Sequence, residues 1–234
     1  MTGSASVRGV EVVTFGCRLN LVESELMRRA AAAAGRDNLV IVNTCAVTAE
    51  AARQARQAIR RLKRERPEAD IGVTGCAAQI EPLQFAEMPE VARIVGNAEK
   101  TRPATWDKGQ SERIKVPDIL RAVPPPEAPA EGIEDHTRAF LAVQTGCDHR
   151  CTFCVIPFGR GPSRSSPPET VIAAVQRLAE KGFREIVLTG VDLTSYGADL
   201  GGEARLGGLV KAILRAAPGL ERLRLSSVDC IEVD

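Results

Sequence analysis

Apolar residues in the first hundred positions form short runs that alternate with longer amphipathic segments. Four runs, at residues 10–16, 39–45, 70–76 and 92–95, have the length and β-branched content of buried strands. Helices are predicted between them at residues 21–34, 49–66 and 80–88, the second with Thr48 as its N-cap. This alternation of strands and helices predicts an α/β domain built on a parallel, Rossmann-like sheet with helices on its faces.

A second set of alternating segments follows residue 137. Strands are predicted at 139–145, 184–190 and 222–228, and helices at 168–181 and 206–217. Such a repeat is typical of a (β/α) barrel, whose active site lies at the carboxyl ends of its strands. Between the two sets, residues 110–136 contain five prolines and little apolar periodicity, which predicts a semi-rigid linker. The expected domains are therefore 1–109 and 137–234.

Composition narrows the class of protein. The chain has 234 residues, enough for one large or two ordinary domains, and 44% of them are hydrophobic. No apolar run is long enough for a membrane helix, and the first residues lack the pattern of a signal peptide. Seven cysteines, an odd number, suit ligand thiols better than a disulfide framework, so we expect a cytoplasmic protein without a membrane partner. The net charge of +1 does not by itself indicate nucleic-acid binding.

Three cysteines stand within eight residues in a C-x3-C-x2-C spacing: Cys147, Cys151 and Cys154. Thiols this close do not readily pair with one another, but they suit a soft metal or an iron–sulfur cluster. A 4Fe–4S cluster held by three thiolates keeps one iron open for a substrate. The alternative is a zinc site made by the same cysteines with His149, because Cys3His is a common tetrahedral ligand set.

Three further cysteines, Cys17, Cys45 and Cys76, each stand at or just past the end of a predicted strand. The carboxyl ends of parallel strands share one edge of a sheet, where open α/β folds bind ligands. Gly16 and Gly75 precede two of these thiols and allow a sharp backbone turn. These three cysteines are thus either metal ligands or small apolar side chains that fill the core.

The flanks of the C-x3-C-x2-C loop indicate a family. Residues 139–147 (Ala-Phe-Leu-Ala-Val-Gln-Thr-Gly-Cys) lead into the loop, residues 156–165 (Ile-Pro-Phe-Gly-Arg-Gly-Pro-Ser-Arg-Ser) leave it, and Phe153 precedes its last cysteine. Together they resemble the methylthiotransferase branch of the radical S-adenosylmethionine (SAM) enzymes. The exit run and residues 16–20 (Gly-Cys-Arg-Leu-Asn) are most similar to the subgroup that modifies threonylcarbamoyladenosine in tRNA.

The resemblance implies two 4Fe–4S clusters. One would be held by Cys147, Cys151 and Cys154 and would bind SAM, and the other by Cys17, Cys45 and Cys76. It also implies that Phe153 packs near the adenine of SAM and that Gly190 lies at its amino group, with core packing and a simple turn as the respective alternatives. Arg160 and Arg164 are candidates for binding a substrate phosphate or the SAM carboxylate, or else are solvated loop arginines. The family usually continues Arg-Ser-Arg after the position of Ser163, whereas this chain has Arg164, Ser165 and Ser166.

The activity implied is insertion of a methylthio group at position two of the adenine ring, beside the tRNA anticodon, with an electron donor as a further partner. Radical chemistry on a cluster needs no side chain as acid, base or nucleophile, so no catalytic residue is predicted. Alternatives are the isopentenyladenosine and ribosomal-protein enzymes of the same family, or a non-catalytic iron–sulfur or zinc module. The resemblance covers the N-terminal domain and about half of the barrel, so we expect these residues alone to turn over poorly.

Cationic residues follow one face of the helix predicted at 49–66: Arg53, Arg56, Arg60, Lys63 and Arg64. A row of this kind is usually a solvated helix surface. The alternative is a contact with the phosphates of tRNA, which a salt-dependence measurement distinguishes.

Overall fold

The computed structural model describes residues 9–122 and 137–229, in two compact units. The first unit is built from the described residues up to 122 together with Cys151–Arg160. The second is built from residues 137–150 and from Gly161 onward. The segment Cys151–Arg160 thus belongs to the first unit, although it follows the linker region and lies in the chain segment expected to form the barrel. The α/β class predicted from the sequence is confirmed in both units.

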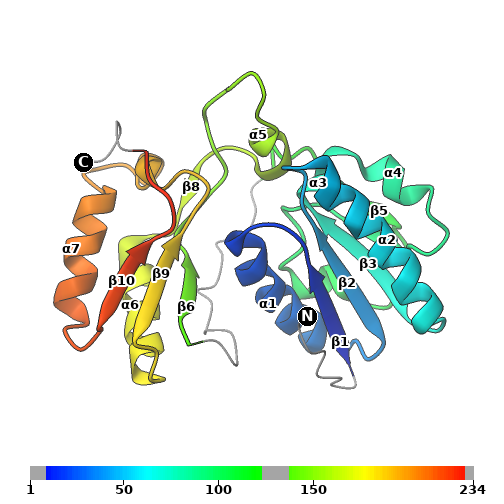
Figure 1. Ribbon diagram of the computed structural model, residues 1–234, viewed down its shortest axis with the longest axis horizontal. Coiled ribbons are helices and arrows are strands. Elements are labelled where there is room, and N and C mark those ends of the chain that lie inside the picture. Colours follow the sequence, from blue (N-terminus) through cyan, green and yellow to red (C-terminus); the bar gives the residue numbers. More distant parts are fainter. Residues whose placement is uncertain (1–8, 123–136, 230–234) are drawn as a thin grey trace. The chain divides into compact units, whose positions relative to one another are not determined.

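A five-stranded parallel sheet forms the centre of the first unit (Figure 1). Its strands begin nearly level with one another, since Val10 pairs with Leu39 and Leu39 with Asp70. Four of the strands match the predicted runs, and the fifth lies within the predicted linker, whose residues 123–136 are outside the described part of the chain. In spatial order the strands are β1 (Val10–Thr14), β2 (Leu39–Thr44), β3 (Asp70–Gly75), β4 (Arg93–Val95) and β5 (Ile114–Lys115).

Helices connect these strands. The predicted N-cap is confirmed, because the Thr48 hydroxyl accepts a hydrogen bond from the backbone N–H of Ala51 at 3.2 Å. The helix expected at 80–88 is instead two short helices, the second of which begins at a proline that interrupts the first. The helices of this unit, with one 3-10 turn, are α1 (Arg18–Ala33), α2 (Ala49–Glu65), α3 (Cys76–Ile80), α4 (Pro82–Ala86), η1 (Pro103–Trp106) and α5 (Ile156–Arg160).

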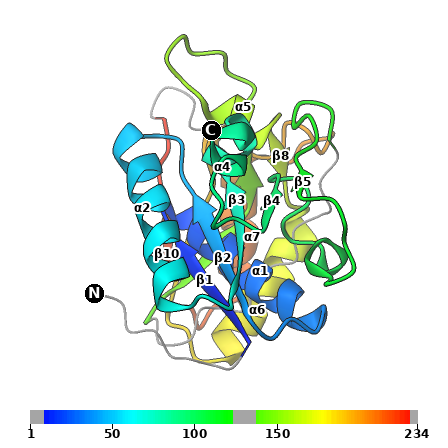
Figure 2. The ribbon, with the colours of Figure 1, turned by 90° about the vertical axis from the view of Figure 1, so that its right-hand side faces the viewer.

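The two long helices, α1 and α2, cover opposite faces of the sheet, as Figure 2 shows. Val40 and Val42 of β2 pack in one core with α2, whereas Leu39 and Ile41 pack in another with α1. This division follows from the alternation of side chains along a strand. Strands β1, β2 and β3 follow one another in the same direction across the sheet, whereas α1 and α2 lie on opposite faces of it. The β1–α1–β2 and β2–α2–β3 crossovers therefore have opposite hands. One of them therefore departs from the usual right-handed rule.

The second unit has a three-stranded parallel sheet in the order β10, β9, β6. Its two long helices pack on the same face of this sheet, in a core that includes Leu141, Leu178, Leu188 and Ile213. Helices on one side of a parallel sheet are the arrangement found in (β/α) barrels. A short antiparallel pair lies apart from the sheet. The elements are β6 (Ala139–Ala142), β7 (Gln144–Thr145), β8 (Arg164–Ser165), α6 (Pro168–Glu180), β9 (Glu185–Thr189), η2 (Leu193–Ser195), α7 (Leu206–Ala216) and β10 (Arg222–Leu225).

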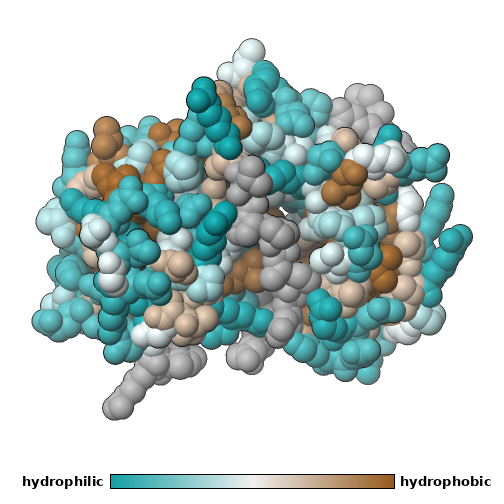
Figure 3. Space-filling model, turned by 180° about the vertical axis from the view of Figure 1, so that it is seen from behind, coloured by the Kyte–Doolittle hydropathy of each residue, from teal (hydrophilic) through white to brown (hydrophobic). Residues whose placement is uncertain are grey.

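The surface seen in Figure 3 is mainly hydrophilic, with separate apolar patches. Among the described residues, no helix combines the length and the apolar character needed to cross a membrane.

Candidate metal centres

Three thiols lie at the carboxyl ends of consecutive strands in the first unit. Cys17 is the N-cap of α1, Cys45 directly follows β2, and Cys76 is the first residue of α3 after β3. Cys17 is exposed, whereas Cys45 and Cys76 are buried. None of the six cysteines in the described part of the chain forms a disulfide. Because the strands are parallel and nearly in register, these three ends share one edge of the sheet.

Glycine precedes two of the thiols, and its missing side chain decides how closely the chain can approach. Gly16 has φ +101°, and a Cβ at this position would lie 2.7 Å from the Sγ of Cys45. Gly75 has φ +95°, and a Cβ there would lie 2.2 Å from the carbonyl oxygen of Thr44. The expected sharp turns are therefore confirmed at both glycines. The backbone next to Cys17 passes directly against Cys45.

Electrostatics also connect the three thiols. Burial raises the pKa of Cys45, and the neighbouring sulfurs of Cys76 and Cys17 raise it further, against a backbone N–H and the charge of Arg160 that lower it. The raised pKa favours the protonated thiol in the absence of a metal. A soft cation would displace that proton, so metal binding at this edge releases protons.

The side chain of Asn20 holds the loops of the thiol edge together. Its amide nitrogen donates to the backbone oxygens of Phe15 at 2.7 Å and Thr44 at 3.1 Å, and its amide oxygen accepts from the Sγ of Cys17 at 3.9 Å. Asn20 is buried, and such a residue on a helix is stable only when its polar atoms are satisfied. It thus orients two of the three strand ends that carry thiols.

A second asparagine supports Cys76. The amide nitrogen of Asn97 donates to the Cys76 Sγ at 3.7 Å and to the backbone oxygen of Gly159 in α5. A Cβ at Gly159 would lie 3.1 Å from the Cβ and 3.4 Å from the Sγ of Cys76. Helix α5 therefore packs closely on this thiol. The sequence pattern gave no sign of Asn97, which lies in the loop after β4.

Arg160 is buried within the first unit. Its guanidinium donates to the carboxylate of Glu23 at 2.7 and 3.0 Å, and to the amide oxygen of Asn20. The ammonium of Lys100 donates to the same carboxylate at 2.6 Å. Glu23, Lys100 and Arg160 therefore form a buried ion triad. From the sequence, Arg160 was either a contact for phosphate or SAM or a solvated loop arginine. It is instead buried, and the other two members of the triad were missed.

The charges of the buried ion triad are strongly coupled. Burial alone would raise the pKa of Glu23, but the charges of Arg160 and Lys100 lower it to about 2. The pKa of Arg160 is raised despite its burial, first by Glu23 and then by the nearby Cys76 and Cys17. Glu23 and Arg160 are therefore charged at neutral pH, and Arg160 lies within electrostatic reach of the thiols.

The cysteines of the C-x3-C-x2-C loop are divided between the two units. Cys147 follows β7 in the second unit, after Gly146, whose φ is +74° and where a Cβ would lie 1.9 Å from the carbonyl oxygen of Pro162. Cys151 and Cys154 belong to the first unit, where the N–H of Cys154 donates to the oxygen of Cys151 at 3.0 Å. Convergence of the three loop thiols on one cluster stays a prediction.

Cys147 also lies beside His149 and Asp192. One ligand atom from each of the three lies within 4.8 Å of the others, and in the described part of the chain this is the one such set. The Cys147 thiol donates to the Asp192 carboxylate at 3.7 Å, and the His149 Nε2 lies 3.3 Å from the same oxygen. Asp192 was not predicted, although it follows β9 at the same carboxyl edge. These atoms suit zinc as well as an iron site.

The remaining candidates for SAM contacts have clear positions. A Cβ at Gly190 would lie 2.8 Å from the Cδ2 of Leu193 and 2.9 Å from the amide oxygen of Gln144, so a larger residue would have to displace these side chains. Arg164 pairs with Thr145 between β8 and β7, and its guanidinium donates to the backbone oxygen of Pro162 at 3.2 Å. The side chain of Phe153 is exposed, as a residue that packs on a ligand would be before binding.

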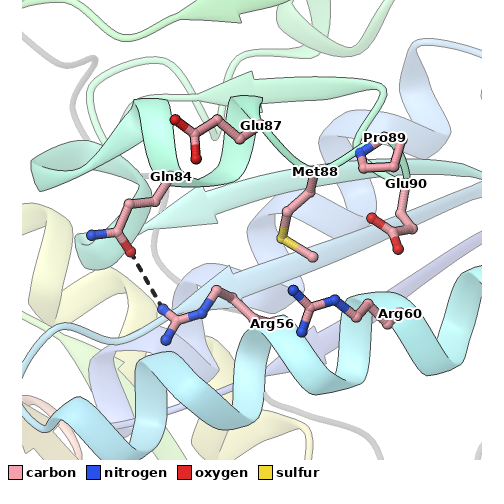
Figure 4. Close-up of a pocket in the computed structure, with 7 residues that line it drawn as sticks. All are labelled: Arg56, Arg60, Gln84, Glu87, Met88, Pro89 and Glu90. Carbon is pink, nitrogen blue, oxygen red and sulfur yellow. Dashed lines mark hydrogen bonds between the residues drawn. The ribbon is translucent and has the colours of Figure 1, made fainter.

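The cationic face of α2 borders two hollows. One, of about 480 Å³, is lined by Arg56 and Arg60 opposite Gln84 and Glu90 (Figure 4). The other, of about 530 Å³, is lined by Arg60 and two further arginines of α2 with Phe15. Elsewhere on the helix, Arg53 forms an ion pair with Glu50 at 2.7 Å, so its charge is already balanced and is less able to bind an anionic ligand. Arg60 borders both hollows and is the best placed for an anionic ligand.

Comparison with known proteins identifies the family of both parts of the chain. Residues 9–96 match the uncharacterized protein family UPF0004, and residues 141–227 match the radical SAM superfamily. Over 224 residues the chain is 46% identical to threonylcarbamoyladenosine tRNA methylthiotransferase MtaB of Rickettsia prowazekii, covering 96% of this chain and 53% of that protein. The chain belongs to the radical SAM methylthiotransferase family. It spans about half the length of the curated relatives it matches.

Other members of the family are also similar. MtaB of Bacillus subtilis is 35% identical, covering 94% of this chain and 51% of that protein. A protein of Symbiobacterium thermophilum named tRNA-2-methylthio-N(6)-dimethylallyladenosine synthase is also 35% identical, covering 93% of this chain and 51% of that protein. The radical SAM methyltransferase TsrM of Kitasatospora setae, solved with tryptophan and a SAM analogue, superposes with a TM-score of 0.63 at 15% identity. That match covers 94% of this chain and 54% of TsrM, and it shows the fold alone.

Proposed function

We propose that this protein is a tRNA methylthiotransferase that places a methylthio group at position two of threonylcarbamoyladenosine beside the anticodon. It would use SAM and two 4Fe–4S clusters, one on Cys147, Cys151 and Cys154 and one on Cys17, Cys45 and Cys76. The relatives named MtaB support the tRNA substrate and the choice of nucleoside. The relative named for dimethylallyladenosine supports the alternative nucleoside.

The proposal rests mainly on the three thiols at one edge of the first sheet. Cys17, Cys45 and Cys76 lie on loops that reach this edge from three adjacent strands, and Gly16 lets the chain pass against Cys45. A donor set made only of thiols fits a soft metal or an iron–sulfur cluster better than a hard cation. Three ligands fit a cluster with one open iron, and a core of aliphatic residues would not need the polar support of Asn20 and Asn97.

When bound, a reduced cluster on Cys147, Cys151 and Cys154 would supply the electron that cleaves SAM and so allow attack on an unactivated carbon. The residues of the chain supply binding and position. Thiols hold the metal, Asn20 and Asn97 orient two of them, and the buried ion triad sets the local charge. Phe153 of the first unit and Gly190 of the second are proposed SAM contacts. Arg164 is a proposed contact for a carboxylate or phosphate.

Partners follow from this chemistry. We propose tRNA as the substrate, bound in part by the cationic face of α2, and a one-electron donor that reduces the clusters. A cytoplasmic location agrees with the need for reduced thiols at both sites.

Anaerobic reconstitution tests the proposal. We expect about eight irons per chain, and about four when either Cys17 or Cys151 is replaced by Ala, because each triad holds one four-iron cluster. Loss of all iron in one of these variants, or no loss in either, contradicts the assignment of two separate sites. With a tRNA substrate, mass spectrometry of the product nucleosides distinguishes the threonylcarbamoyl from the dimethylallyl compound.

A further inference from the structure

Buried charge in the described residues is confined to a single place. Three charged residues are buried there, namely Glu23, Lys100 and Arg160, and all belong to the first unit. Two of them are cations and one is an anion. Glu23 can balance only one of the two cations, so the buried ion triad carries one positive charge overall. Burying an unbalanced charge is costly unless a neighbouring group compensates it.

The thiol edge is the neighbour of this charge. Cys17, Asn20 and Glu23 follow one another at three-residue spacing along α1, which puts them on one face of the helix. The amide oxygen of Asn20 accepts from both the Cys17 thiol and the Arg160 guanidinium. One polar atom therefore links the first thiol with the buried arginine.

A second link runs through the residue before Arg160. Gly159 packs against Cys76, with room for no more than a small group, and its backbone oxygen accepts from Asn97, which also donates to the Cys76 Sγ. Helix α5 is thus fixed on the side of the thiols, and the next residue turns its side chain to Glu23 and Asn20. The last two residues of this short helix are thus held by contacts within the first unit.

We propose that Arg160 is a positioning residue that balances the charge of the iron–sulfur site on Cys17, Cys45 and Cys76. This inference rests on the proposed function, since it assumes a cluster at that edge. Three thiolates on an oxidised 4Fe–4S cube give one negative charge overall, which matches the single positive charge of the buried ion triad. Reduction adds a second negative charge, so the arginine should make the cluster easier to reduce.

The test uses a background in which Cys147, Cys151 and Cys154 are all Ala, so that only the N-terminal site loads. Arg160→Met removes the charge at similar side-chain length. Arg160→Lys keeps the charge but lacks the guanidinium that makes two hydrogen bonds to Glu23. Iron content and an EPR-monitored redox titration are the readouts. We expect Arg160→Met to disfavour reduction at least tenfold, a shift of about 59 mV to lower potential for one electron. Arg160→Lys should keep most of the parent value.

Glu23→Gln should shift the reduction potential in the opposite direction to Arg160→Met. It makes the triad more positive at nearly constant shape, so the potential should rise. A purely structural role of these residues would not produce two shifts of opposite sign. Arg28→Met is the matched control, because Arg28 lies on the outer side of α1 and pairs with Glu25. If the background loads about four irons but neither Arg160→Met nor Glu23→Gln moves the potential, the inference is wrong and the proposed function stands. If the background binds no iron, the proposed N-terminal cluster fails and the inference fails with it.

Discussion

Replacing Glu23 by Gln tests the energetics of the buried ion triad without any metal. The variant keeps the size of the side chain but leaves Arg160 and Lys100 without their shared anion. The pKa of Glu23 is about 2 in the folded chain against an ordinary 4.5, and the difference corresponds to about 3 kcal/mol of stability at neutral pH. Removing one partner of a buried pair costs about 3–5 kcal/mol in other proteins, which agrees.

The pH dependence has a definite sign. Because the folded pKa is lowered, the contribution of Glu23 is fully present above about pH 4.5 and is lost as the pH falls towards 2. Wild-type protein should therefore lose stability in this window, and Glu23→Gln should lose about 3 kcal/mol less than wild type over it.

The fluorescence of Trp106 is a suitable probe for urea unfolding of the metal-free, reduced chain. It is the sole tryptophan, it is buried, and its indole N–H donates to the backbone oxygen of Lys100 at 2.8 Å, so it reports on the first unit next to the triad. Glu50→Gln is the control, since Glu50 forms an exposed pair with Arg53 and should cause no resolvable change. A free energy of unfolding equal to that of wild type in Glu23→Gln at pH 7 would refute the reasoning.

Three further predictions concern the proposed sites. Gly16→Ala should lower reconstituted iron from about eight to about four per chain, because its Cβ would collide with the neighbouring thiol. His149→Ala should leave iron content unchanged while Cys147→Ala halves it, since a cluster on the loop uses thiols alone. If neither variant loses iron and both lose bound zinc, the zinc alternative is favoured. Arg60→Gln should weaken tRNA binding and reduce its salt slope by about 0.7–0.9, the contribution of one phosphate contact.

Matched variants separate these effects from general damage. Gly109→Ala should keep full iron content, because a Cβ at Gly109 meets nothing within 4 Å. Arg53→Gln should leave tRNA affinity nearly unchanged, because Arg53 is already paired on the exposed side of α2. An Arg60→Gln protein that binds tRNA with the parent salt slope would make the cationic face of α2 an ordinary solvated surface.

Periodicity alone was enough for most of the fold. Strands that open with a continuous apolar run, such as Leu39–Val42 in β2, and long amphipathic helices such as α2 are specified by local pattern, and the Thr48 cap by local hydrogen bonding. Local pattern failed where an element is short or is supported from a distance. The two-residue strand β5 forms because it can pair with the free edge of β4. A segment of two residues is too short to show an apolar repeat in the sequence.

The candidate thiols were also readable from sequence, because cysteine at the end of a strand and C-x3-C-x2-C spacing are local signals. Their partners were not. Asn20 and Glu23 lie on α1, whereas Asn97 and Lys100 follow β4, and only the packed chain brings these two segments to the thiol edge.

What the sequence determined by itself was therefore the class of fold, the family and the six candidate ligands. Only the tertiary structure decided the partners of Arg160. From its position after the cysteine loop, Arg160 reads as a ligand-binding arginine, yet it is buried against an acid 137 residues earlier in the chain. The physical reason is that ionic contacts depend on distance in space and on burial, neither of which leaves a periodic trace along the chain.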